Sequence, residues 1–377
     1  MSSLSVCLMV KNEELNLRDC LRSVAQHADE IVVIDNGSTD NTVEILTEFD
    51  CKIIYSDKYY FDQARNLYLE QATGEWILAI DADERLTSEG MLGIKKFINS
   101  APEKVMGSYL PFYQYLGSGR WAYIEMMRLF RNHSRIRYND KKIHPSPRPS
   151  IDLLGGVINR GLYSPIHHLD SLEGKRTSNK REKYINLSIE EVDDPGIQVL
   201  LGNEYIAIGE YKEAEVNFQR VIMSSAPEDI KIRACIHLAQ LHVLKEDFDK
   251  ASNILNSIDT NNPQFQSKIQ SVLVINYMKA GLVEKALNSS FMAMEKDPLA
   301  AHNHLNIGTI YDQLGYPEAD KYYCSALKLN PYLEDPVIYG DGDSPNPYLH
   351  QNLVIGTNLK RILKSKEYSK NVNNYST

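Results

Sequence analysis

Short apolar runs alternate along the first third of the chain with segments whose apolar residues recur every three or four positions. The apolar runs, which predict buried strands, cover residues 4–10, 30–40, 51–56 and 75–83. The segments between them, which predict helices, cover residues 15–28, 41–50 and 61–74. Continuous apolar strands that alternate with helices are typical of a parallel sheet covered on both faces. This part of the chain is therefore expected to form an α/β domain with a Rossmann-like, mostly parallel sheet.

Residues 184–331 follow a helical period instead, and their pattern repeats. Similar helix pairs are predicted at residues 200–222, 237–258, 272–294 and 306–327. An alanine occupies the same place in the second helix of each pair, with spacings of 37, 35 and 33 residues between Ala214, Ala251, Ala286 and Ala319. This spacing resembles that of tetratricopeptide repeats, which are helix pairs about 34 residues long. The second half is therefore expected to be an all-α repeat array.

Repeat arrays of this kind form a concave surface that binds peptide or protein segments. A short array also stabilises the domain beside it, and the sequence leaves both roles open. The expected organisation is an α/β domain over residues 1–190 and helical repeats over residues 191–335. The last region, residues 336–377, is expected to hold a capping helix near residues 349–366 and a frayed tail.

Composition limits the classes of protein to which the chain can belong. Its 377 residues, 43% of them hydrophobic, suffice for two domains with their own cores. The net charge of -9 argues against a protein that binds nucleic acid. The five cysteines include no CxxC pair, which indicates reduced thiols in a cytoplasmic protein. No apolar run reaches the roughly 18 residues of a membrane span, and peripheral membrane contact is left open.

Polar residues cluster where three of the predicted strands end. The motifs are KNEE, DNGSTD and DADE, at residues 11–14, 35–40 and 81–84. The carboxyl ends of parallel strands meet at one edge of a sheet, where ligands bind. Asp35, Asp81 and Asp83 would repel one another there unless a cation lay between them. An Asp-x-Asp pair suits Mg²⁺ or Mn²⁺, which would bridge phosphates, because the chain has neither a GxxxxGK[ST] nor a GxGxxG loop. The alternative is that Asp83 caps a helix.

The order of these motifs, followed by RLFRN at residues 128–132, resembles the family 2 glycosyltransferases with the GT-A fold over roughly residues 4–190. The resemblance implies a nucleotide-sugar donor, here a UDP-sugar. It places Glu13 and Asp35 on the uridine, Arg65 near the base or phosphates, and Asp81 near the ribose. The full set of residues expected to contact the donor is Val10, Asn12, Glu13, Asp35, Arg65, Asp81, Ala82 and Asp83.

The resemblance also implies that Asp83 binds the metal ion and that the transfer inverts the sugar's configuration. Further metal ligands are expected among the histidines, with His144 and His168 as the candidates. A single histidine is more often structural, and the His167–His168 pair leaves open which ring takes part.

An inverting transfer needs a base on the acceptor side. Many relatives carry an acid directly after the histidine at position 144, where this chain has Pro145. Glu125 is the expected base and Asp140 is its rival. Arg128 and Arg131 fall in the segment that lies near the acceptor in the family, although either could be a surface charge.

An α/β domain of this family followed by repeats resembles the bacterial peptide glycosyltransferases that modify glycocin bacteriocins on Cys or Ser. It also resembles enzymes that add hexoses to lipopolysaccharide cores. The expected function is metal-dependent transfer of a hexose, from UDP-glucose or UDP-N-acetylglucosamine, to a Cys or Ser side chain of a peptide bound through the repeats. The alternatives are a cell-surface glycan acceptor and a non-catalytic scaffold with a decayed transferase domain. The oligomeric state is left open, with a homodimer as one option.

Overall fold

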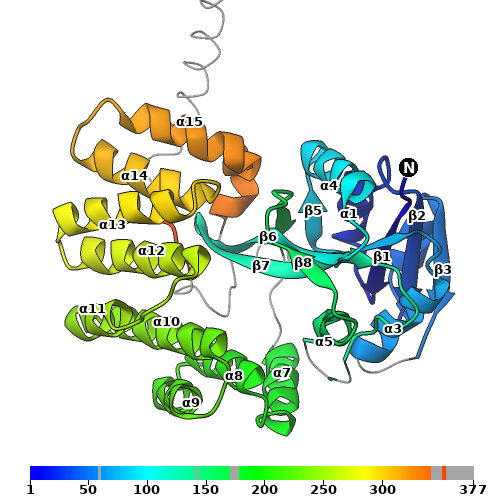
Figure 1. The fold of residues 1–377 in the computed structure, drawn as a ribbon, viewed down its shortest axis with the longest axis horizontal. Coiled ribbons are helices and arrows are strands. Elements are labelled where there is room, and N and C mark those ends of the chain that lie inside the picture. Colours follow the sequence, from blue (N-terminus) through cyan, green and yellow to red (C-terminus); the bar gives the residue numbers. More distant parts are fainter. Residues whose placement is uncertain (58–60, 140, 142–143, 170–177, 341–349, 354–377) are drawn as a thin grey trace, which may run out of the picture. The chain divides into compact units, whose positions relative to one another are not determined.

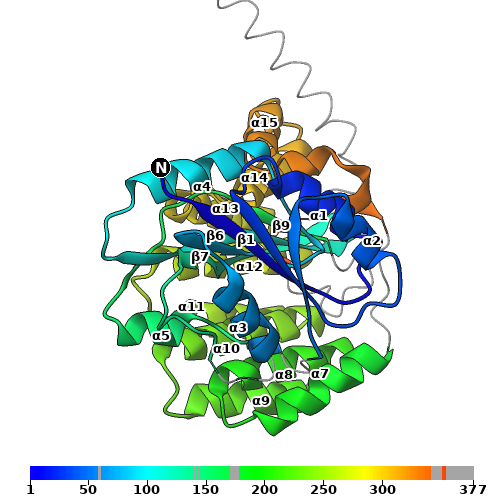
Figure 2. The same cartoon turned by 90° about the vertical axis from the view of Figure 1, so that its right-hand side faces the viewer.

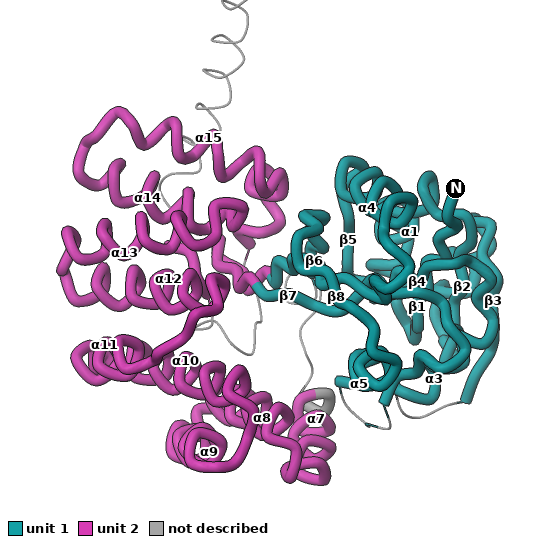
Figure 3. Tube along the Cα trace, viewed as in Figure 1, with its two compact units in different colours: residues 1–114, 124–173 teal, residues 115–123, 174–377 magenta. Residues whose placement is uncertain are grey.

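The computed structural model describes residues 1–57, 61–139, 141, 144–169, 178–340 and 350–353 (Figure 1). The chain divides into two compact units (Figure 3). The first comprises residues 1–114 and 124–173, and the second comprises residues 115–123 and 174–377. The second unit therefore includes a short piece taken from the middle of the first. Among the described helices, none is both long and apolar enough to cross a membrane.

The first unit is built on a mixed sheet to which nine strands of the described chain belong. The strands are β1 (Leu4–Val10), β2 (Glu30–Asp35), β3 (Cys51–Tyr55), β4 (Trp76–Ala79), β5 (Glu84–Leu86), β6 (Val105–Gly117), β7 (Arg120–Arg131), β8 (Val157–Asn159) and β9 (Ile166–His168). Their order is β3-β2-β1-β4-β7-β6-β9-β5, and β8 pairs with β6. β1 pairs in parallel with β2 and β4, as does β2 with β3, so the predicted mostly parallel sheet is confirmed. β4–β7 and β5–β9 are antiparallel.

Helices cover both faces of this sheet. They are α1 (Leu17–Val24), α2 (Thr42–Thr47), α3 (Phe61–Gln71), α4 (Ser88–Ser100) and α5 (Arg148–Leu153). Successive residues of β1 point to opposite faces, so Leu8 packs in a core with α1, α2 and α4 while Cys7 packs in a core with α3 and α5. Figure 2 shows α4 and α3 on opposite sides of the strands. The double covering explains why the strands are continuous apolar runs in the sequence.

The second unit is helical. Its helices are α7 (Ser178–Glu190), α8 (Pro195–Ala207), α9 (Tyr211–Met223), α10 (Glu228–Leu244), α11 (Phe248–Asn256), α12 (Pro263–Lys279), α13 (Val283–Lys296), α14 (Ala301–Gln313) and α15 (Ala319–Leu329), followed by the 3₁₀ turns η1 (Pro331–Glu334) and η2 (Pro336–Tyr339). The four predicted pairs correspond to α8–α9, α10–α11, α12–α13 and α14–α15. The four repeating alanines are fully buried.

Small residues allow the paired helices to approach closely. A Cβ atom added to Gly202 would lie 2.5 Å from Cε1 of Phe218. One added to Gly308 would lie 2.8 Å from Cδ1 of Tyr323. In both pairs a glycine of the first helix therefore accommodates an aromatic ring of the second.

The connection between β6 and β7 lies in the second unit. Ser118 and Gly119 form it with φ angles of 52° and 71°, a conformation that suits a two-residue hairpin turn. The hydroxyl of Tyr115 donates to Oδ1 of Asn330 over 3.0 Å. The backbone N–H of Trp121, which is fully buried, donates to Oδ1 of Asn352 over 2.9 Å. The hairpin tip is thus part of the packed interior of the repeat unit.

The residues expected to form a capping helix, 349–366, fall mostly outside the described residues. The described part, residues 350–353, is not helical. The predicted strand at 75–83 is also shorter than expected: β4 ends at Ala79, and the Asp-x-Asp residues lie in the turn that follows.

Candidate active site

The turn between β4 and β5 carries both aspartates of the Asp-x-Asp motif. The N–H of Ile80 still donates to the carbonyl of Cys7 over 3.1 Å, so the chain leaves the sheet only at Asp81. The N–H of Glu84 then donates to the carbonyl of Asp81 over 3.0 Å and closes the turn. The carbonyl of Asp83 accepts from Leu169 over 2.9 Å. The turn is therefore held both by β1 and by the residue that follows β9.

Two arginines hold the carboxylate of Asp81. Nη2 of Arg65, on α3, donates to Oδ1 over 2.8 Å, and Nη2 of Arg128, on β7, donates to Oδ2 over 2.7 Å. Arg128 also forms an ion pair with Glu84, which is fully buried. A second oxygen of Glu84 accepts from the N–H of Asp81 over 3.0 Å. The four side chains form one network of alternating charge.

The network shifts the protonation of its two acids in opposite directions. Burial opposes the charge of Asp81, but Arg128 and Arg65 outweigh it and hold the pKa of this carboxyl well below its usual range. Burial raises the pKa of Glu84 to about 7 despite Arg128, and the neighbouring charge of Asp81 adds to the rise. Asp81 is therefore the carboxylate that stays ionised near neutral pH.

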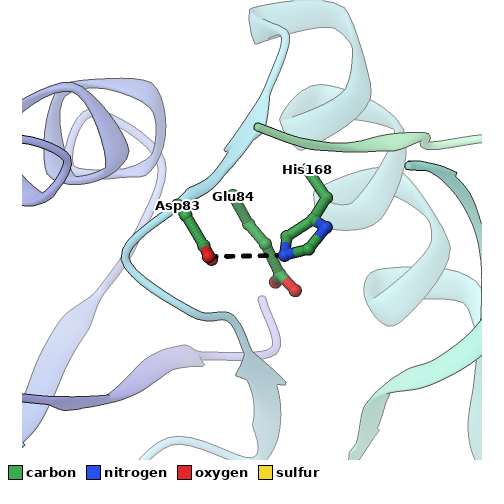
Figure 4. A group of neighbouring side chains, drawn as sticks. All are labelled: Asp83, Glu84 and His168. Atoms are coloured by element: carbon green, nitrogen blue, oxygen red, sulfur yellow. Dashed lines mark ion pairs between the residues drawn. The ribbon is translucent and has the colours of Figure 1, made fainter. Parts of the chain in front are cut away.

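Asp83 faces His168 across the strand pair β5–β9. Glu84 and His168 are directly opposite in the antiparallel register. Nε2 of His168 lies 3.3 Å from Oδ2 of Asp83, and each side chain is 17% exposed (Figure 4). Ligand atoms of Asp83, Glu84 and His168 all lie within 4.8 Å of one another. The structure thus brings together two predicted metal ligands, Asp83 and His168, with Glu84 as a third group.

These side chains fit a divalent cation. Two ligands bound side by side to Mg²⁺ or Mn²⁺ at about 2.1 Å lie roughly 3 Å apart, close to the 3.3 Å between Asp83 and His168. A carboxylate oxygen and an imidazole nitrogen also suit Mn²⁺. The carboxylate of Glu84 forms an ion pair with Arg128, so Asp83 and His168 are the two groups best placed to bind an ion.

His167 faces the opposite way from His168 because successive residues of a strand alternate. Its ring is fully buried and stacks on Tyr113 with a centroid distance of 5.5 Å. Burial lowers the pKa of His167 to about 3. The alternation of side chains along β9 therefore shows that His168, and not His167, faces Asp83. The sequence alone could not make this distinction.

The ends of β1 and β2 are joined by hydrogen bonds at the same edge of the sheet. The carbonyl of Val10 accepts from Asn36 over 2.9 Å. Oδ1 of Asn12 accepts from the N–H of Thr39 over 2.8 Å. The carboxylate of Asp35, 2% exposed, accepts from the N–H of Ser38 over 3.2 Å. Three residues expected to contact the donor, Val10, Asn12 and Asp35, therefore lie at two connected strand ends and in the loop that follows one of them.

The remaining two residues expected at the donor, Glu13 and Ala82, lie in the segments that follow β1 and β4. The N–H of Glu13 donates to Oγ1 of Thr42 over 2.7 Å, and a carboxylate oxygen of Glu13 accepts from Asn16 over 3.3 Å. Ala82, between the two aspartates, is 3% exposed, and its carbonyl accepts from Arg85 over 2.8 Å.

The residues expected on the acceptor side are less closely grouped. Oε2 of Glu125, on β7, accepts from Nη1 of Arg160 over 2.5 Å. Its rival Asp140 lies outside the described residues. His144 is exposed, has a φ of 50°, and is not among the three clustered ligand groups found in the described chain. The base and the role of His144 remain predictions.

Sequence reasoning did not foresee that Glu84 and Arg128 form part of the site. Arg128 was expected near the acceptor, but it pairs with Asp81 and Glu84. The sequence did contain a sign of this role, because Arg128 lies within the apolar run MMRLF. An arginine in such a run, on a strand that pairs with β4, requires a buried acidic partner. The acidic motif DADE supplies that partner.

Two parts of the chain match known protein families. Residues 5–148 match the family described as glycosyl transferase family 2, and residues 301–332 match the tetratricopeptide repeat. A TPR repeat-containing protein of Synechococcus elongatus is 28% identical over 263 residues, covering 67% of this chain and 64% of the relative. The SPbeta prophage-derived glycosyltransferase SunS of Bacillus subtilis is 29% identical over 220 residues, covering 55% of this chain and 50% of the relative. The chain thus spans between half and two thirds of these curated relatives.

Among solved structures, TarS 1-349 of S. aureus in complex with UDP-GlcNAc has a TM-score of 0.36 and 15% identity, covering 78% of this chain and 92% of TarS. Glucosyl-3-phosphoglycerate synthase of Mycobacterium tuberculosis, in complex with Mn²⁺, UDP and phosphoglyceric acid, has a TM-score of 0.26 and 20% identity, covering 29% of this chain and 43% of that one. These scores are too low to carry an argument about the site. From the family matches, the chain is identified as a family 2 glycosyl transferase domain followed by tetratricopeptide repeats.

Proposed function

We propose that this protein is a metal-dependent, inverting glycosyltransferase that moves a hexose from a UDP-sugar to a Cys or Ser side chain of a peptide, in the cytoplasm. One observation carries the proposal. Nε2 of His168 lies 3.3 Å from Oδ2 of Asp83, and the nearby carboxylate of Asp81 forms ion pairs with Arg65 and Arg128. A cation-sized site next to a fixed, ionised carboxylate suits a nucleoside diphosphate at the carboxyl edge of the sheet.

Asp83 and His168 would hold the divalent ion, and the carboxylate of Glu84, which is paired with Arg128, would lie beside them. When bound, such an ion supplies positive charge that stabilises the diphosphate leaving group. Asp81 would accept hydrogen bonds from the ribose hydroxyls, because Arg65 and Arg128 keep it ionised. The loops that carry Asn12, Glu13 and Asp35 would hold the uracil and ribose.

The acceptor would attack the anomeric carbon from the face opposite to the diphosphate, forming a bond from sulfur or oxygen to that carbon as the bond to phosphate breaks. The acceptor proton would pass to Glu125 or to its rival Asp140. A thiol needs less assistance than a hydroxyl, because its pKa is about 8.5. The combination of this domain with peptide-binding repeats favours a peptide over a glycan acceptor.

The test is UDP release by the purified full chain with UDP-glucose or UDP-N-acetylglucosamine, in the presence of Mn²⁺, Mg²⁺ or a chelator. The proposal expects release from one donor that requires the metal and rises when Cys-containing peptide is added. Release stimulated by an oligosaccharide but not by peptide would move the acceptor to a glycan. Absence of both release and metal-dependent UDP binding, measured by titration calorimetry, would mean that the domain is not an enzyme.

A further inference from the structure

A short segment near the end of the described chain lies on the first helices of three successive repeats. Residues 350–353 are not helical, and none of them is more than 9% exposed. Leu353 belongs to one buried apolar cluster with Val243 of α10, Val274 of α12 and Ile310 of α14. The segment therefore lies across the array in the way that a bound peptide would.

The contacts that hold this segment are directed at its main chain. Nδ2 of Asn306, on α14, donates to the carbonyl of Gln351 over 2.9 Å, and Oδ1 of Asn306 accepts from the N–H of Leu353 over 2.7 Å. The carbonyl of Trp121, on β7, accepts from the N–H of Gln351 over 3.0 Å. Main-chain hydrogen bonds of this kind bind an extended peptide whatever its side chains. Asn306 and the edge of β7 therefore form a site for extended polypeptide, which we call the Asn306 slot.

The side chains of the segment also bond to β7. Oδ1 of Asn352 accepts from the N–H of Trp121 over 2.9 Å, and Oε1 of Gln351 accepts from the N–H of Tyr123 over 3.0 Å. In a regular strand pair, main-chain carbonyls accept from such N–H groups. The main chain of the segment thus pairs with β7 only in part, and a peptide in its place could pair with the same N–H groups through its own carbonyls.

The segment fills the Asn306 slot imperfectly. Nε2 of Gln351 and Nε of Arg120 are buried and make no hydrogen bond within the described chain. A cavity of about 90 Å³ also remains beside His350, against α10 and α12. Buried donors without acceptors and unfilled space both weaken the binding of a segment. A peptide that supplied an acceptor and filled the cavity would therefore bind more tightly than the chain's own residues.

The chain's own segment has the advantage of a tether. The carbonyl of Gly340 accepts from the N–H of Ser118 at the hairpin tip over 2.8 Å, and residues 341–349 join this point to the segment. A short tether gives an effective concentration in the millimolar range. A free peptide with the same contacts therefore does not displace the segment at micromolar concentration, whereas a peptide that fits better does.

We propose that residues 350–353 occupy the Asn306 slot of the free protein as an intramolecular competitor, and that the acceptor peptide binds in the slot by replacing them. The inference rests on the proposed function, because it states where the acceptor of that reaction binds and what limits its access. A peptide is favoured over a glycan, because Asn306 bonds to a carbonyl and an N–H group of an extended main chain.

The test is fluorescence anisotropy of the full chain with a labelled peptide that has the sequence of residues 347–356. The double variant Gln351→Ala, Asn352→Ala loses the side-chain bonds of the segment to β7 but keeps the slot. We expect it to bind the peptide at least about tenfold more tightly than the wild type, because its own segment competes less well. A second probe carries a methyl group on the amide nitrogen that corresponds to Leu353. This probe should bind more weakly, because it cannot donate to Asn306.

Two further variants identify the place where the peptide binds. Asn306→Ala, added to the double variant, should abolish the gain, because the slot itself is lost. Asn276→Ala is the matched control. It removes a buried amide of α12 that donates to the carbonyl of Phe248, so it should bind the peptide as the wild type does. If circular dichroism shows that the double variant is unfolded, Gln351→Ala alone carries the test, with a gain expected in the same direction.

Three results would overturn the proposal. Equal binding of the peptide by the wild type and the double variant would show that the segment does not compete. Equal binding of the methylated and unmethylated peptides would place their binding outside the Asn306 slot. A gain in Asn276→Ala as large as that of the double variant would show that any loosening of the repeats exposes a surface for peptide.

The two proposals fail separately. If the double variant binds the peptide more tightly while the wild type releases no UDP from any donor, the proposed function fails and the occupied slot stands. If a Cys-containing peptide stimulates UDP release with the same half-saturating concentration in the wild type and the double variant, the acceptor binds elsewhere and this inference alone fails.

Discussion

Nη2 of Arg128 donates to Oδ2 of Asp81 over 2.7 Å. The same guanidinium also pairs with the fully buried Glu84, so one side chain fixes both Asp81 and Glu84. Because Arg65 holds the other oxygen of Asp81, the carboxylate is oriented by protein groups alone. A donor nucleotide would therefore meet an acid that is already ionised and correctly placed, which reduces the cost of ordering it on binding.

Loss of Arg128 should destabilise the first unit. In Arg128→Gln, Glu84 remains buried without this compensating charge, and breaking a buried pair costs about 3–5 kcal/mol. Urea unfolding at neutral pH measures the change. The double variant Arg128→Gln, Glu84→Gln should regain part of the loss, because the uncompensated carboxylate is removed.

The matched control for Arg128 is Arg148→Gln, which breaks a half-exposed pair with Asp152 one turn away on α5. Exposed pairs contribute less than about 1 kcal/mol. If the two glutamine variants lose equal stability, the network around Asp81 does not hold the turn.

Replacement of Asp83 should affect the metal ion rather than the fold. Asp83→Ala is expected to weaken Mn²⁺-dependent UDP binding at least about tenfold, because it removes one of the two facing ligands. Titration calorimetry with and without a chelator measures this, and circular dichroism verifies the fold.

A comparison of two histidines tests the metal assignment further. His168→Ala should reproduce the loss seen for Asp83→Ala, whereas His144→Ala should bind UDP and Mn²⁺ as the wild type does, because His144 lies outside the ligand cluster of the described chain. The reverse result would transfer the metal site to His144.

A methyl group at Gly202 should loosen the first repeat. In Gly202→Ala the new Cβ would overlap Cε1 of Phe218 at 2.5 Å, and overpacking of a core costs about 1–3 kcal/mol. Thermal unfolding of the second unit measures the effect. The double variant Gly202→Ala, Phe218→Leu should lose less than the sum of the two single changes, since the smaller side chain makes room. Full additivity would show that the ring is not the obstacle.

Acid should weaken the second unit through its buried histidines. The pKa of His302 is about 3 in the folded protein, below the unfolded value of 6.5, so the unfolded chain binds more protons between these values. The stabilisation is complete above pH 6.5 and declines as the pH falls toward 3. Lowering the pH from 7 to 5 should therefore cost about 2 kcal/mol through this one group.

His302→Gln should remove that share of the pH dependence, measured as the difference in unfolding free energy between pH 7 and pH 5. His133→Gln, in a loop of the first unit, is the matched control. An unchanged difference in the His302 variant would contradict the burial argument.

The pattern of apolar residues along the sequence was enough to predict the first four strands of the first unit and the helix pairs of the second. The apolar strands β1, β2 and β4 follow from continuous apolar runs and the four helix pairs from a period of 3.6 residues, and the repeating alanines mark close helix contacts. The polar ends of those strands also predicted the edge of the sheet where the site lies. These features depend on neighbours in the sequence or on the regular order of a parallel sheet.

Pairing between distant segments was not predictable in the same way. Arg128 is 47 positions from Asp81, and only the antiparallel placement of β7 beside β4 brings them together. The choice between His167 and His168 depends on the register of β5 against β9, which no local pattern encodes. Tyr115 is buried in the second unit, and its place in the aromatic run of residues 107–117 does not indicate this.

The hairpin tip at residues 115–123 has a consequence for synthesis of the chain. The hydrogen-bond acceptor of the Trp121 N–H is Asn352, which is synthesised 231 residues later. At about 5–20 residues per second on the ribosome, that wait lasts roughly 10–50 seconds. During this time two tyrosine-rich strand ends and a tryptophan are exposed in the nascent chain. The repeats therefore cannot be exchanged for another array simply by joining it after the first domain. A new array would have to pack against the hairpin tip at residues 115–123, which precedes it in the chain.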